Sequence, residues 1–134
     1  MSHWTKIKLN INNQDVLAKA LKRMGLNVEA GDFTISQYGT SSKANLKVDK
    51  AVGFVKGEDG CFSMVGDFYH ASDSKLKSWY GNNADFTSKL NAAYGIEHAK
   101  QQLSELGGDW TIEENEDGVI GKDGLIRMVA ISFT

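Results

Sequence analysis

The chain has 134 residues, of which 41% are hydrophobic and 24% charged, and its formal net charge is −2. This length and composition are typical of a single domain over 1–134 with one hydrophobic core. The apolar runs are too short for a membrane span, which takes about 20 residues, and the one cysteine, Cys61, excludes an intramolecular disulfide.

The chain begins with the pattern of a strand followed by a helix. Apolar and polar residues alternate over 7–11, which predicts a strand with one face in water. Asn12 and Asn13 then precede apolar residues at helical spacing over 16–24, and Gly25 follows them. Asparagine is a good helix cap and glycine a good helix stop, so a capped helix is expected here.

A run of strands follows. Residues 33–35 indicate a second strand, the stretch "QYGTSS" a turn, and the alternation over 44–48 a third strand. The stretch "VGFVKGEDGCFSMVGDF" places two apolar runs on either side of "KGEDG", a loop of the Gly/Asp type. It therefore predicts an antiparallel hairpin.

The second half predicts a long helix and two more strands. Over Ala71–Ala84 the pattern is loose, with start signals for a short helical turn that a glycine and two asparagines then stop. A helix is expected over Asp85–Leu106. Its apolar residues lie on two faces that change over at Gly95, so either the helix bends there or its first turns pack against a different surface than its last. Trp110 begins a strand, and a closing strand is expected over Leu125–Phe133.

This order of elements favours the α+β class. We expect a mostly antiparallel sheet with two main helices packed on one face, in a ferredoxin-like arrangement. Charge is unevenly divided, since residues 1–56 carry nine Lys/Arg against four Asp/Glu and residues 57–134 carry six against thirteen. A fold that separates these halves would present a basic face to an acidic partner, whereas a fold that interleaves them would cancel the field.

The stretch "MVGDFYH" carries the densest group of chemically useful side chains. Asp67, Tyr69 and His70 suit acid/base chemistry, or a metal site if His3 or His98 supplied a third ligand. The favoured interpretation is that Asp67 is an acid at the end of a strand, where it accepts backbone N–H groups. No catalytic residue, metal ligand or cofactor is therefore assigned.

Other motifs give little support for a catalytic or metal site. His3 as third residue could chelate copper or nickel only with a free amine at Met1, and Cys61 lies in no known catalytic cysteine motif. No glycine-rich phosphate loop is present. The stretch "EENEDGVIGKDG" fails as a calcium loop, because Gly124 stands where the bidentate glutamate should be, and it is expected to be an exposed acidic turn.

Two groups of aromatic and basic residues are candidate contact surfaces. Tyr69, Trp79 and Tyr80 are expected to line one of them. The other is a basic aromatic surface of the kind that binds single-stranded nucleic acid. Its candidate residues are Trp4, Lys6, Lys8, Tyr38, Lys43 and Lys47.

Several stretches together resemble one known family. They are "MSHWTKIKLNI", "YGTSSKANLKV", "VGFVKGEDGCFSMVGDFY", "LNAAYGIEHAK" and the final "LIRMV". In collinear order over nearly the whole chain, they resemble the small plastid hypothetical reading-frame family of cyanobacteria, algal plastids and cyanobacterial phages, a domain of unknown function. "GDFYH" and "NEDGVIGKDG" most resemble the phage branch. One departure is that relatives often place an aromatic residue and then histidine after the tyrosine equivalent to Tyr94, whereas this chain has Ile96, Glu97 and then His98.

The resemblance implies photosynthetic cells or their phages and brings no established activity. We expect a small binding or regulatory accessory protein that acts through protein–protein contact in the cytoplasm, which is the host's cytoplasm for a phage protein. A metal-dependent or acid/base enzyme using Asp67, Tyr69 and His70 is one alternative, and a single-stranded nucleic-acid binder is another. Self-association is left open, and no membrane partner is expected.

Overall fold

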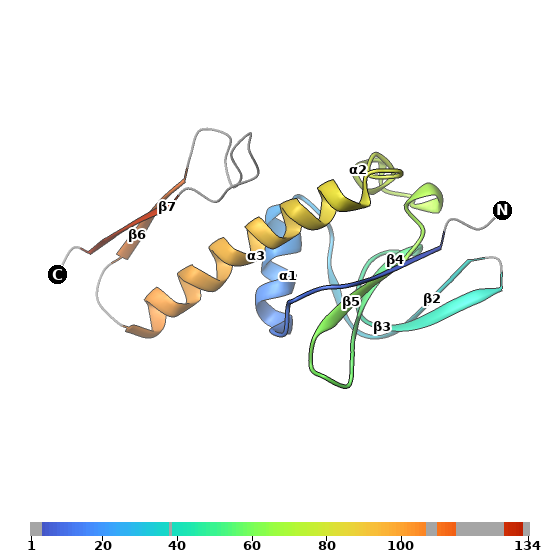
Figure 1. Cartoon of the computed structure of the whole chain (residues 1–134), viewed down its shortest axis with the longest axis horizontal. Helices are drawn as coiled ribbons and strands as arrows, with labels where there is room; N and C mark the ends of the chain where they lie inside the picture. Colours follow the sequence, from blue (N-terminus) through green and yellow to red (C-terminus); the bar gives the residue numbers. More distant parts are fainter. Residues whose placement is uncertain (1–3, 38, 107–109, 115–127, 133–134) are drawn as a thin grey trace.

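The structure is a computed structural model that describes residues 4–37, 39–106, 110–114 and 128–132 (Figure 1). In chain order its elements are β1 (Thr5–Lys8), α1 (Gln14–Arg23), β2 (Glu29–Gln37), β3 (Thr40–Asp49), β4 (Val52–Lys56), β5 (Phe62–Gly66), the 3-10 helix η1 (Phe68–His70), α2 (Ser74–Lys77), α3 (Asn83–Leu106), β6 (Trp110–Glu114) and β7 (Met128–Ser132).

Five strands form the main sheet in the order β1-β5-β4-β3-β2, and each pairs antiparallel with its neighbours. β1 and β2 therefore lie at opposite edges and run in the same direction, and α1 connects them. The strands β2 to β5 follow one another through short turns. β6 and β7 pair antiparallel in a separate two-stranded sheet.

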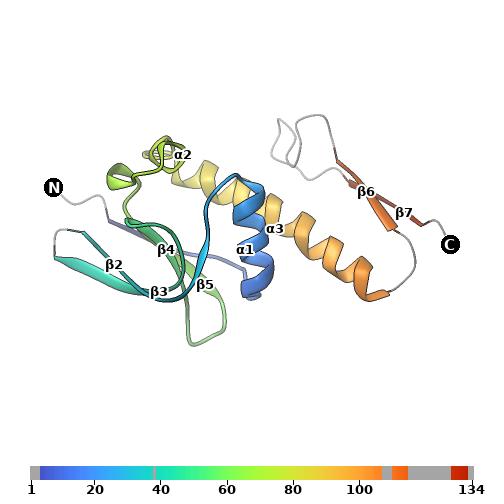
Figure 2. The ribbon, with the colours of Figure 1, turned by 180° about the vertical axis from the view of Figure 1, so that it is seen from behind.

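The predicted α+β class is confirmed, with helices packed against an antiparallel sheet (Figures 1 and 2). The connectivity differs from the ferredoxin-like pattern, in which a second helix separates the third strand from the fourth. Here no helix interrupts the run from β2 to β5, because each turn between them is too short to hold one. A second crossover is therefore absent from the main sheet that the structure describes.

The first helix is capped as the sequence predicts. Asn13 precedes α1, and its side-chain oxygen accepts the backbone N–H of Val16 at 3.1 Å. Gly25 follows the helix with φ of 84°, a left-handed conformation that favours glycine. The buried face of α1 consists of Val16, Leu17, Ala20 and Leu21.

The predicted hairpin joins β4 to β5. Their register pairs Val52 with Gly66 and Lys56 with Phe62, and the loop is closed by the Gly57 N–H, which donates to the Cys61 carbonyl at 2.8 Å. The turn predicted over "QYGTSS" is shorter than expected, because β3 already begins at Thr40.

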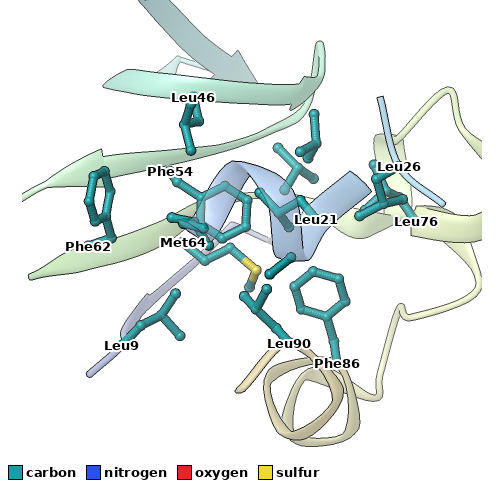
Figure 3. Packing of buried hydrophobic residues seen from close by; sticks show 14 of the residues in the cluster. Leu9, Leu21, Leu26, Leu46, Phe54, Phe62, Met64, Leu76, Phe86 and Leu90 are labelled. Carbon is teal, nitrogen blue, oxygen red and sulfur yellow. The ribbon is translucent and has the colours of Figure 1, made fainter. Parts of the chain in front are cut away.

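One hydrophobic core lies between the sheet and the helices. Figure 3 shows Phe54 and Met64 of the sheet beside Leu21 of α1 and Phe86 and Leu90 of α3, and all five are at most 2% exposed. Burying such apolar side chains is the main favourable term in folding. The helices thus cover the face of the sheet that carries these residues.

The long helix α3 buries residues of both predicted groups only as far as Ile96, and Leu106 at its end is 73% exposed. Phe86 and Leu90 belong to the main core, whereas Ala92 and Ile96 are buried outside that cluster. The helix begins at Asn83, two residues before the expected start, and Asn82 separates it from the left-handed Gly81. Among the described residues, no helix is both long enough and apolar enough to cross a bilayer.

The sheet is curled. The evidence is that β2 contacts β5, although two strands lie between them. Gly53 in β4 permits this close approach. A Cβ atom at Gly53 would lie 2.9 Å from Ala44 Cβ, Ile35 Cγ1 and the Leu46 carbonyl oxygen. Ile35, although it lies on an edge strand, is only 1% exposed as a result.

The two oppositely charged halves of the chain are interleaved. β5, from the acidic half, lies between β1 and β4 from the basic half. Arg23 of α1 also pairs with Glu97 of α3 at 3.1 Å, and Lys8 of β1 pairs with Asp59 of the β4–β5 loop. The segregated basic face that the sequence left open is therefore not formed by these elements.

Candidate functional site

Asp67 has the role of a strand-end acid, which confirms the favoured interpretation of "MVGDFYH". It follows β5, and its Oδ1 atom accepts the backbone N–H of Tyr69 at 2.9 Å, which caps η1. Its own N–H donates to the Ala51 carbonyl at 2.8 Å. Asp67 therefore turns the chain from the sheet into the segment that carries Tyr69.

The other carboxylate oxygen of Asp67 faces His70. Asp67 is fully buried, its Oδ2 has no hydrogen-bond partner in the structure, and His70 Nε2 lies 3.8 Å away. No three His, Cys, Asp or Glu side chains of the described residues converge as a metal site. His98 is exposed on α3, and its ring stacks on that of Tyr94 with the ring centroids 5.9 Å apart. His3 lies outside the described residues.

Asp49, which belongs to no recognisable sequence motif, holds the segment after η1 against the sheet. Its carboxylate accepts the N–H groups of Ala51 at 3.1 Å, Ser72 at 3.1 and 3.0 Å, and Asp73 at 2.9 Å. Asp73 in turn caps α2 by accepting the Lys75 N–H at 2.8 Å. Aspartate is common in turns. The sequence does not reveal, however, that this carboxylate accepts the N–H group of a residue 23 positions later.

Asp49→Ala is expected to destabilise the protein by about 2 kcal/mol, because hydrogen bonds to a charged acceptor contribute about 1.5–3 kcal/mol. Asp49→Asn keeps one oxygen acceptor and is expected to lose about half as much. Urea unfolding followed by circular dichroism measures both changes. A midpoint for Asp49→Ala equal to that of the wild type would show that these bonds contribute nothing to stability.

An aromatic surface, defined as Trp4, Phe68, Tyr69, Trp79 and Tyr80, forms around η1, α2 and the start of β1. Its inner rings rest on the buried Phe86 of α3. Phe68 packs edge-to-face on Phe86 with ring centroids 5.1 Å apart, and Trp79 does so at 5.7 Å. Such pairs add about 0.5–1.5 kcal/mol beyond area burial, so the core fixes the inner part of this surface.

The outer part of the aromatic surface is exposed. Tyr69 and Tyr80 are 46% and 45% exposed, and their rings meet edge-to-face at 5.2 Å. Beside them is an open pocket of about 360 Å³. It is lined by Trp4, Thr5, Phe68, Tyr80, Gly81 and Asn83.

Two lysines lie over the rings of this surface. Lys77 Nζ is 5.9 Å from the centroid of Tyr69, and Lys89 Nζ is 4.9 Å from the centroid of Trp79. Both distances permit a cation–π interaction. The aromatic surface is thus flanked by positive charge.

The structure does not unite the basic surface that the sequence suggested for nucleic acid. Lys6 of β1 and Lys47 of β3 share a face but are separated by Val65 and Gly53, which pair between them. Lys47 lies instead over Phe33, 5.4 Å from the ring centroid. Tyr38 lies outside the described residues.

Lys8 of the same proposed surface is already paired. Its hydrogen bond with Asp59, and the charge of Asp59, raise the pKa of Lys8, and the same hydrogen bond lowers the pKa of Asp59. The half-buried Cys61 belongs to this loop, where its N–H donates to Asp59 Oδ1 at 3.0 Å. This region therefore serves to close the β4–β5 hairpin.

The sequence predicts contact roles for Trp4, Tyr69, Trp79 and Tyr80, and the structure brings these four residues together. The sequence does not predict such roles for Phe68, Asn83 and the two lysines, because the pocket joins the start of the chain to residues more than 60 positions later. Comparisons of the chain with protein-family models, curated proteins and solved structures find no match. The family resemblance therefore stays a prediction.

Proposed function

We propose that this protein is a binding protein that recognises a partner protein through its aromatic surface. The observation that carries this proposal is the pair Tyr69 and Tyr80, which lie together, exposed, beside an open pocket. Among the large apolar side chains that the structure describes, Leu106 alone is also exposed. The exposed aromatic side chains of the described residues are thus concentrated at one place.

The chemistry of the tyrosines supports protein binding. Tyrosine is enriched at interfaces and in binding hot spots, since it buries a large apolar area and its hydroxyl can still hydrogen-bond. The inner rings, Phe68 and Trp79, are fixed on Phe86. A surface held in this way loses little conformational entropy on binding, which favours affinity.

The resemblance to a family of photosynthetic cells supports a search for the partner in cyanobacteria, and an accessory or regulatory role for the complex. The enzyme alternative has less support, because the fully buried Asp67 is not among the pocket-lining residues. The nucleic-acid alternative has less support because Lys6 and Lys47 are separated across the sheet.

The test is a capture experiment from a nuclease-treated cyanobacterial lysate with two tagged variants. Tyr69→Ser/Tyr80→Ser removes the exposed rings without opening the core, and Leu106→Ser removes an exposed apolar side chain elsewhere. We expect a stoichiometric protein to be captured by the wild type and by Leu106→Ser. Capture by the double tyrosine variant should fall at least tenfold, since central aromatic anchors contribute about 2 kcal/mol or more each.

Two outcomes would contradict the proposal. One is equal capture by all three proteins, which would place the contact elsewhere. The other is recovery of nucleic acid without a protein partner when nuclease is omitted. Sedimentation of the purified wild type shows separately whether a second copy of the chain is the partner.

A further inference from the structure

We infer that the pocket takes one apolar side chain of an acidic peptide segment, and that Lys77 and Lys89 bind the carboxylates on either side of it. This inference rests on the proposed function, because it names the chemistry of the partner at the same aromatic surface. The pocket, the two lysines over neighbouring rings and the orientation of those rings are three separate observations that support it.

The pocket has the size and lining for a single side chain. Its volume of about 360 Å³ is at the lower end for ligand sites, which range from about 300 to 1,000 Å³. Trp4, Phe68 and Tyr80 supply apolar walls, and Thr5 and Asn83 add polar groups. An aromatic or large aliphatic side chain with its backbone at the rim fits this combination.

The two lysines lie over rings that are next to pocket-lining rings, since Tyr69 meets Tyr80, and Trp79 packs beside Phe68 on Phe86. Lys77 and Lys89 lie over Tyr69 and Trp79, and neither forms an ion pair with any residue in the described ranges. Of the acids nearby in sequence, Asp73 caps α2, and Asp85 lies one turn before Lys89 on α3. A partner that brings carboxylates to the two lysines therefore complements this surface.

The ring orientations favour a peptide over a nucleic acid. Stacked bases need open ring faces. Here the ammonium groups lie over the faces of Tyr69 and Trp79, and Tyr69 meets Tyr80 at 63° and His70 at 86°. Tyr80 lines the pocket, and the rings of Tyr69 and Trp79 each have an ammonium group over one face, so these rings do not form a flat open platform for bases.

The probes are three fluorescent seven-residue peptides and an oligothymidylate. One peptide has a central phenylalanine between three glutamates on each side, the second has serine at the centre, and the third replaces the glutamates with lysines. We expect the first peptide to bind in fluorescence anisotropy and to shift the NMR signals of the Trp4 and Trp79 indoles. Binding should be at least fivefold weaker for the serine peptide and undetectable for the lysine peptide.

Protein variants test the two lysines. Lys77→Gln/Lys89→Gln is expected to weaken the binding of the first peptide at least fivefold. Lys19→Gln/Lys56→Gln removes the same charge from exposed positions on α1 and β4 and is expected to leave binding unchanged. The inference is overturned if no peptide binds, if affinity is independent of peptide charge, if both double variants behave alike, or if the oligothymidylate binds more tightly than the acidic peptide.

The same lysine variants in the lysate capture separate this inference from the proposed function. If Tyr69→Ser/Tyr80→Ser loses the partner and Lys77→Gln/Lys89→Gln keeps it, the aromatic surface binds a protein but the acidic chemistry is wrong. If the tyrosine variant also keeps the partner, the proposed function itself is wrong. Loss of the partner by both variants, together with binding of the acidic peptide, supports both the proposed function and the acidic-peptide inference.

Discussion

Gly66→Ala is expected to destabilise the protein by about 3 kcal/mol or more, since backbone strain alone contributes about 1–3 kcal/mol. Gly66 has φ of 137°, in the region that favours glycine. A Cβ atom there would also lie 2.0 Å from the Ala51 carbonyl oxygen and 2.8 Å from Val52 Cα. Both neighbours are backbone atoms, so neither can move without disturbing the start of β4.

This clash occurs where the sheet leads into the candidate site. The next residue, Asp67, donates its N–H to the same Ala51 carbonyl and caps η1. Moving Ala51 away from a methyl group at Gly66 would therefore weaken that hydrogen bond and displace Tyr69. We expect Gly66→Ala to lose both stability and binding.

Gly60→Ala is the matched control for this prediction. Gly60 also has a positive φ, of 85°, but no atom lies within 4 Å of a Cβ built there. An alanine at this position would therefore have the backbone strain without the clash, and we expect it to lower the free energy of unfolding by about 1 kcal/mol. Urea unfolding of both variants compares them. If Gly66→Ala lost no more stability than Gly60→Ala, the close approach to Ala51 would have no energetic weight.

Much of the fold could be predicted because its signals are local. The cap at Asn13, the stop at Gly25 and the "KGEDG" loop each act within a few residues, and the structure shows them where the sequence places them. The burial of Phe86, Leu90 and Ile96 along α3 also follows from the pattern, because it depends only on the 100° rotation per residue. Local patterns of this kind do not say which strands become neighbours.

The connectivity and the pocket depend on contacts that one sequence does not reveal. Nothing near β1 indicates that it pairs with β5 rather than with another strand, so the ferredoxin-like pattern was expected instead. Trp4 reaches Phe68 and Tyr80 only because β1 is the edge strand beside β5. Asp49 accepts N–H groups from Ser72 and Asp73 for a similar reason, since the β3–β4 turn lies beside the segment after η1.

Phe86→Ala is expected to destabilise the protein by about 3–5 kcal/mol, the usual range for truncating a buried phenylalanine. Phe86 is fully buried, and its ring supports both Phe68 and Trp79. The cavity left by the ring would lie directly beneath the aromatic surface. Phe86→Leu fills most of this cavity and is expected to cost about 1–2 kcal/mol.

Leu21→Ala separates a loss of stability from a loss of the site. Leu21 is also fully buried, and its truncation is expected to cost about 2–5 kcal/mol, but it takes no part in the ring contacts of the aromatic surface. Under conditions where both variants remain folded, only Phe86→Ala should shift the NMR signal of the Trp79 indole and weaken partner binding. If Leu21→Ala changed that signal equally, support for the aromatic surface would come from the core as a whole. If neither variant changed it, Trp79 would be held by α2 and Lys89 rather than by Phe86.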